Sequence, residues 1–116
     1  MDKQTIINQI RAFNQACKDK GHTLSFCALV PEMEHYEHTS YTLQVFANWA
    51  QGMPCSDVFD ILVPLLFEST TVEVREKIYR MDIYDRNGDL HCQFEELIIE
   101  NEINYNPLTA YQFSRQ

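Results

Sequence analysis

Residues 78–95 read IYRMDIYDRNGDLHCQFE, and this stretch decides the fold. Two runs rich in strand-forming residues flank Asn87-Gly88, the dipeptide that best tolerates the positive φ angles of a type I′ hairpin turn. With these two as turn residues, apolar side chains meet on one face of the paired strands and opposite charges meet on the other. The facing pairs would be Arg86 with Asp89, Asp85 with Leu90, Ile83 with Cys92, Met81 with Phe94, and Arg80 with Glu95. The segment therefore predicts an antiparallel hairpin.

The same residues carry a second pattern, because positions 85–96 place oxygen-bearing side chains at regular spacing. The first, third, fifth and twelfth positions are Asp85, Asn87, Asp89 and Glu96. This spacing resembles the calcium loop of the EF-hand family, and the resemblance implies that these four residues bind calcium through hard oxygen ligands.

The loop departs from the EF-hand pattern at two positions. Leu90 stands where the family has the glycine of its sharp turn, and Cys92 replaces the usual aliphatic residue. No second loop with spaced carboxylates precedes it in the sequence. We therefore favour the hairpin and keep a calcium-binding EF-hand-like module as an alternative.

The N-terminal half predicts one helix and two strands. Ile6, Ile10, Phe13 and Cys17 recur at helical spacing. Asp2 is placed to cap this helix and Gly21 to end it. Residues 22–30 are rich in strand-forming residues, and Pro31 should end this first strand. After a polar loop, side chains at 41–49 alternate with a period of two, which predicts a second strand.

Two further helices are expected before the hairpin. Ser56 and Asp57 open an apolar helical segment, within which Pro64 should cause a kink or a break. Thr70 followed by Glu73 matches a capping box and predicts a short helix to about Lys77. Residues 97–103 are compatible with either a short helix or a longer strand.

These elements define an α+β fold in the order α-β-β-α-α-β-β. The simplest arrangement is one mainly antiparallel sheet of about four strands with helices packed on one face. We expect a single domain over 1–104 and an extended or flexible C-terminal tail over 105–116.

Charge and composition limit the classes of partner and the cellular compartment that we expect. The 116 residues carry a formal net charge of −8, which repels nucleic acid and anionic lipid. The longest apolar run, 61–67, is too short to cross a bilayer, and no secretory leader is visible, so we expect a cytoplasmic protein. Its four cysteines are scattered without a CxxC pair, so reduced thiols are expected rather than disulfides.

A transition-metal site is the third functional hypothesis. His35 and His38 stand among three glutamates, and imidazoles with carboxylates can hold zinc in a metal-dependent hydrolase. Their spacing matches neither HExxH nor HxxEH, so a solvated polar loop is the preferred interpretation.

No nucleophile has a recognisable catalytic setting, and no phosphate-binding glycine loop is present, so no cofactor or catalytic residue is predicted. The leading hypothesis is a non-enzymatic binding or regulatory protein that acts through protein contacts. These contacts would be self-association or capture of a partner with a basic patch, because an open sheet leaves an edge that another chain can pair with.

Overall fold

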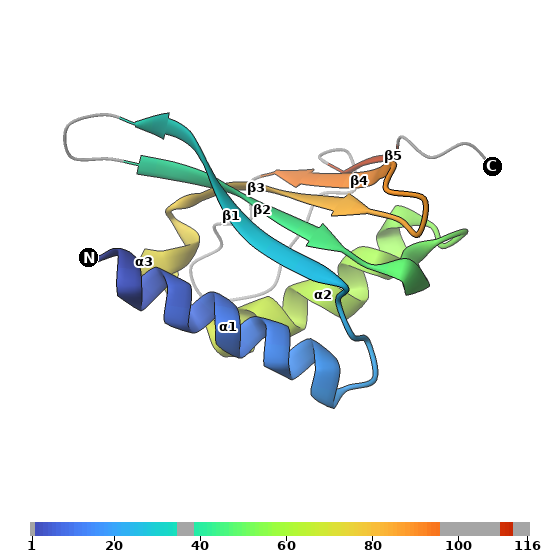
Figure 1. Cartoon of the computed structure of the whole chain (residues 1–116), viewed down its shortest axis with the longest axis horizontal. Coiled ribbons are helices and arrows are strands. Elements are labelled where there is room, and N and C mark those ends of the chain that lie inside the picture. Colours follow the sequence, from blue (N-terminus) through green and yellow to red (C-terminus); the bar gives the residue numbers. More distant parts are fainter. Residues whose placement is uncertain (1, 35–38, 96–109, 113–116) are drawn as a thin grey trace.

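A five-stranded sheet with helices on one of its faces forms the protein, in a computed structural model that describes residues 2–34, 39–95 and 110–112 (Figure 1). The elements in chain order are α1 (Lys3–Asp19), β1 (Phe26–Glu34), β2 (Thr39–Phe46), the 3-10 helix η1 (Asn48–Ala50), α2 (Cys55–Ser69), α3 (Val72–Arg75), β3 (Ile78–Tyr84), β4 (Leu90–Glu95) and β5 (Ala110–Gln112). The predicted α+β class, the element order and the one-sided helical layer are confirmed.

The strands lie in sequence order, β1-β2-β3-β4-β5. All neighbouring strands are antiparallel except β2 and β3, which are parallel and are joined by the crossover through α2 and α3. The core lies between the sheet and the helices, where Leu43, Val45, Met81 and Ile83 are fully buried. These four side chains alternate along β2 and β3, as the period of two requires for one buried face.

Helix α1 begins and packs as the sequence predicts. The Asp2 carboxylate accepts a hydrogen bond from the Thr5 amide at 2.8 Å and so caps the helix N-terminus. The four apolar residues at helical spacing are the buried face of the helix. Gly21 follows with φ +81°, a conformation that favours glycine, and the helix has ended at Asp19.

Strand β1 does not end at Pro31, which corrects the prediction. The strand begins at Phe26, four residues later than expected, and continues through Pro31 to Glu34. Proline is tolerated because β1 is the first strand of the sheet, so a residue facing the outer edge needs no N–H for a partner strand. The expected loop is correspondingly shorter, and residues 35–38 lie outside the described part of the chain.

The hairpin between β3 and β4 is confirmed, but its turn is not the predicted one. Asp85 pairs with Asp89 through a backbone hydrogen bond, and Gly88 donates to the Asp85 carbonyl, both at 2.9 Å. The loop therefore has three residues and ends at Gly88 with φ +80°. The expected pairs Arg86 with Asp89 and Asp85 with Leu90 are wrong, since Tyr84 faces Leu90.

A bulge at His91 restores the predicted register beyond the turn. Tyr84 pairs with Leu90 and Ile83 pairs with Cys92, so His91 is an extra residue in β4. The pairs of Met81 with Phe94 and of Arg80 with Glu95 follow as predicted. The longer loop and the bulge each shift the register by one residue and cancel.

Helix α2 runs through Pro64 without a break, so of the two expected outcomes the break is wrong and the kink stays a prediction. Proline inside a helix costs about 3 kcal/mol through the lost hydrogen bond and the steric clash. Leu62, Val63 and Leu66 around it are fully buried, and burial of each stabilises the fold by roughly 1.5–3 kcal/mol. Burial around the proline outweighs its local cost.

The short helix α3 starts one residue later than predicted. Its cap is Thr71, whose side chain accepts a hydrogen bond from the Val74 amide. Thr70 instead donates to the Leu66 carbonyl at 2.6 Å at the end of α2. The helix ends at Arg75, before the expected Lys77.

The expected domain boundary at residue 104 lies outside the described residues, as do residues 97–103. From the segment predicted as a tail, Ala110–Gln112 form β5 and pair antiparallel with β4.

Candidate functional site

The residues of the proposed calcium loop lie at the tip of the hairpin. Asp85 is 3% exposed, and its Oδ1 accepts hydrogen bonds from the amides of Asn87 at 2.9 Å and Asp89 at 3.2 Å. Strands β3 and β4 flank the loop, in place of the two helices of an EF-hand. Glu96 lies outside the described residues. The described part of this loop therefore uses its first carboxylate to close a turn.

The proposed transition-metal pair, His35 and His38, also lies outside the described residues. The two other histidines have different packing partners. His22 packs edge-on against Trp49 with ring centroids 4.9 Å apart, and His91 is buried in β4. The hydrolase hypothesis thus stays a prediction.

The outer edge of β1 presents backbone groups to which no described strand pairs. Tyr41 of β2 donates its amide to the Lys77 carbonyl, and Ala47, the residue after β2, donates its amide to the Tyr84 carbonyl, so both amides point to the β3 side. The backbone N–H and C=O groups of successive residues point alternately to the two sides of a strand. The backbone groups of the even-numbered residues of β2 therefore point to β1, where their partners are Phe26, Ala28 and Val30. The N–H and C=O groups of Cys27 and Leu29 consequently point to the open edge. Pro31 has the same parity, which explains how it fits within the strand.

A groove of about 420 Å³ runs beside this edge, between α1 and β1. Its apolar wall contains Ile7 and Ile10 from the helix and Leu29 and Pro31 from the strand. Two exposed cations of the same helix, Lys3 and Arg11, also line it. The groove combines an apolar surface with positive charge on a chain whose net charge is −8.

Cys27 lies in this groove as a protonated thiol. Burial, with a smaller contribution from Cys17, raises the pKa of Cys27 to about 12. Burial likewise raises the pKa of Cys17 to about 11. Because the thiolate is the nucleophilic form of cysteine, neither residue is activated for nucleophilic catalysis at neutral pH.

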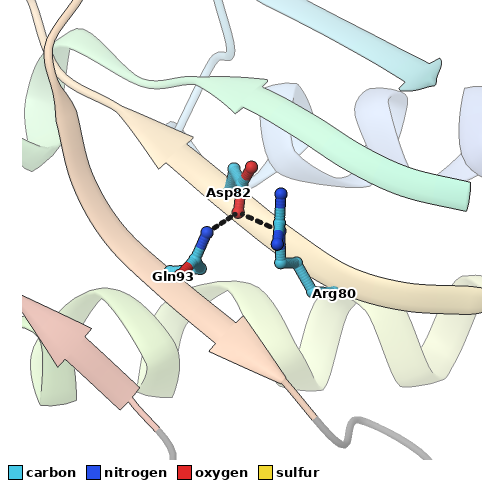
Figure 2. A network of polar contacts seen from close by, with 3 residues as sticks. All are labelled: Arg80, Asp82 and Gln93. Atoms are coloured by element: carbon cyan, nitrogen blue, oxygen red, sulfur yellow. Dashed lines mark hydrogen bonds and ion pairs between the residues drawn. The ribbon is translucent and has the colours of Figure 1, made fainter. Parts of the chain in front are cut away.

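The sheet face opposite the helices carries a polar network at its centre (Figure 2). Asp82 Oδ1 lies 3.0 Å from Arg80 Nε and accepts a hydrogen bond from Gln93 Nε2 at 3.0 Å. The Asp82 side chain is only 5% exposed, and a charge that is buried to this extent needs a partner. The guanidinium group of Arg80 compensates it. This network stabilises the pairing of β3 with β4.

Cys55 and Cys92 form a disulfide, which corrects the expectation that all thiols are reduced. The bond joins the first residue of α2 to β4 across a sequence separation of 37 residues. Cys17 and Cys27 are free. Sequence spacing did not reveal the pair, because the fold alone brings these two positions together.

The groove was also missed, although one residue signalled its edge. A proline within a run of strand-forming residues is typical of an edge strand as well as of a strand end, so Pro31 is compatible with both. The helical half of the groove has no signal of its own, since Ile7, Lys3 and Arg11 are ordinary residues of an amphipathic helix.

Comparison of the chain with known protein families, with characterised proteins and with solved structures gives no match. Among the described residues, no helix has the length and apolar character needed to cross a membrane. Functional inference therefore rests on the residues and geometry of this chain.

Proposed function

We propose that the protein is a non-enzymatic interaction domain that captures an extended segment of a partner protein along β1. The observation that supports this most directly is the open edge of β1 beside the groove between α1 and β1. An extended peptide can add a strand to such an edge, where main-chain hydrogen bonds give affinity and side-chain pockets give specificity.

The groove defines the chemistry of the partner segment. The outward amides of Cys27 and Leu29 would pair with carbonyl groups of the incoming strand, and the outward carbonyls would accept its amides. Alternate side chains of that strand would face the apolar wall, because side chains of a strand alternate between its two faces. Lys3 and Arg11 favour carboxylates on the same segment. The expected ligand is an extended peptide with alternating apolar residues and acidic neighbours.

Charge separates this proposal from self-association through β1. Two copies that each carry a net charge of −8 repel one another, whereas the cations beside the groove attract an acidic segment. A partner with a basic patch stays a prediction for other surfaces of this acidic chain.

The test is selection of a displayed random-peptide library on the immobilised full-length protein, followed by fluorescence anisotropy with synthetic versions of enriched peptides. We expect enriched sequences with alternating apolar residues and carboxylates. The variant Lys3→Glu/Arg11→Glu should weaken binding by roughly tenfold, from the reversal of two exposed charges beside the groove. The matched variant Lys18→Glu/Lys20→Glu makes the same change in net charge at the C-terminal end of α1, away from the groove, and should bind normally.

Amide hydrogen exchange supplies the second measurement. A bound peptide should slow exchange at Cys27 and Leu29. Binding that leaves these two amides unprotected, or equal effects of the two charge-reversal variants, would refute pairing along β1. A concentration-dependent dimer that protects the same amides without peptide would instead assign the edge to self-association and overturn the proposal.

A further inference from the structure

A buried cluster of three metal-ligating side chains lies where the start of α2 meets β4. Cys55, His91 and Cys92 are all buried, and one potential ligand atom from each lies within 4.8 Å of the other two. Neighbouring residues in a regular strand point to opposite faces of a sheet. The bulge at His91 removes this alternation and lets His91 and Cys92 converge on Cys55 of α2.

The hydrogen bonding of His91 fixes which ring nitrogen is available. Nε2 lies 2.7 Å from the carbonyl oxygen of Met53. Because a carbonyl oxygen only accepts, Nε2 carries the proton and Nδ1 of the neutral ring presents a lone pair. A ring nitrogen bonded to a backbone carbonyl is the usual support of a histidine that binds metal through its other nitrogen.

Nδ1 of His91 has no hydrogen-bond partner among the described residues, although the side chain is 0% exposed. An unsatisfied buried acceptor destabilises the fold, and buried polar atoms are rarely left in this state. The disulfide cannot satisfy it, since neither sulfur carries a hydrogen. Within the part of the chain that the structure describes, no donor therefore reaches this atom when the disulfide is formed.

We propose that reduction of the Cys55–Cys92 disulfide converts this cluster into a zinc site formed by both thiolates and His91 Nδ1. A thiol reductant supplies two electrons and two protons to the disulfide and is itself oxidised to a disulfide, which yields two cysteine thiols. Zinc then displaces one proton from each thiol. The two thiolates balance the double positive charge of the ion and the imidazole adds none, so the buried site is neutral.

The distances are compatible with this exchange. Zinc binds cysteine sulfur at ~2.3 Å, so two sulfurs around one tetrahedral ion lie ~3.8 Å apart. The Cα atoms of Cys55 and Cys92 are 5.7 Å apart, which allows side-chain rotation to reach this separation. Among the described residues no fourth Cys, His, Asp or Glu joins the cluster, so an exogenous ligand completes the coordination. Disulfide and zinc would each connect α2 to β4.

The test uses the full-length protein and zinc or cobalt ions alone. Protein reduced with a phosphine should bind about one zinc ion per chain in competition with a chromophoric indicator, and cobalt should give thiolate-to-metal charge-transfer absorption. The oxidised protein should bind none. Cys55→Ser/Cys92→Ser should abolish binding, and His91→Gln should weaken it by at least about tenfold. The control Cys17→Ser/Cys27→Ser, which changes the free cysteines, should bind as the native protein does.

Thiol alkylation followed by mass spectrometry repeats the test without any substitution. Zinc should protect Cys55 and Cys92 of the reduced native chain and leave the labelling of Cys27 unchanged. Reduced native protein that takes up no zinc, or that shows no selective protection, would overturn the proposal. Equal zinc binding by the reduced chain and by Cys55→Ser/Cys92→Ser would overturn it as well.

Discussion

Reduction of the Cys55–Cys92 disulfide should lower the free energy of unfolding by about 4 kcal/mol. The bond closes a loop over a sequence separation of 37 residues. The chain-entropy relation for a loop of this size gives ~13 cal/mol/K of entropy removed from the unfolded state, or about 4 kcal/mol at 25 °C. A chain of 116 residues should unfold with an entropy of ~0.24 kcal/mol/K. The expected fall in melting temperature is therefore about 15 °C.

Circular dichroism during heating, with and without a phosphine reductant, measures this shift. The variant Cys55→Ser/Cys92→Ser should melt near the reduced native protein and should not respond to reductant. Saturating zinc should restore most of the lost melting temperature of the reduced native chain, since a ligand at 1,000 times its Kd raises the free energy of unfolding by about 4 kcal/mol. It should not stabilise the serine variant.

A fall of less than about 4 °C on full reduction, checked by thiol titration, would refute the loop-closure reasoning. That result would mean that the packing of α2 against the sheet already confines the two cysteines in the unfolded ensemble. It would leave the zinc proposal standing, because zinc uptake is measured separately. Conversely, a large fall without zinc rescue would support the loop argument and count against the metal site.

Three further predictions concern the edge strand, the turn and the first helix. In the free protein, amide exchange should be faster at Cys27 and Leu29 than at Ala28, whose amide pairs with β2; equal protection of all three by NMR would contradict the assigned edge. Asp85→Ala should destabilise the fold by about 1–3 kcal/mol in calcium-free buffer, measured by urea unfolding, because two turn amides lose their acceptor. A hydrogen bond from the Thr5 backbone amide holds the pKa of Asp2 below its ordinary 3.8. The stability that the Asp2 carboxylate contributes is therefore present above pH 3.8 and lost as the pH falls through the lower pKa of the folded state. The difference in melting temperature between native protein and Asp2→Asn should accordingly change between neutral pH and pH 3, and a constant difference would contradict the cap.

The hairpin shows how far sequence reasoning can reach. The pairs Ile83 with Cys92 and Met81 with Phe94 were predicted correctly because a one-residue slip would expose every apolar side chain. The turn was predicted wrongly, since Asn87-Gly88 also fits a three-residue loop that ends in glycine. Side-chain patterning fixes the register of long strands, whereas the few residues of a turn permit several local solutions.

The candidate sites depend on contacts that sequence order does not contain. Cys55 and Cys92 are distant in the chain and meet because α2 packs under β4. The groove needs both the position of β1 at the edge and the placement of α1 beside it, and neither follows from local periodicity. The strand order, with its parallel pair of β2 and β3, likewise follows from how the crossover packs.

The parallel contact between β2 and β3 has a consequence for synthesis on the ribosome. The strands β1 and β2 can form a hairpin as soon as Phe46 has emerged, but β3 is complete only at Tyr84. At ~5–20 residues per second, the intervening segment takes ~2–8 s to produce. During that interval the backbone groups on the β3 side of β2 lack their hydrogen-bond partners. The apolar face of the nascent hairpin also lacks α2, so we expect α1, already made, to cover that face until the second half arrives.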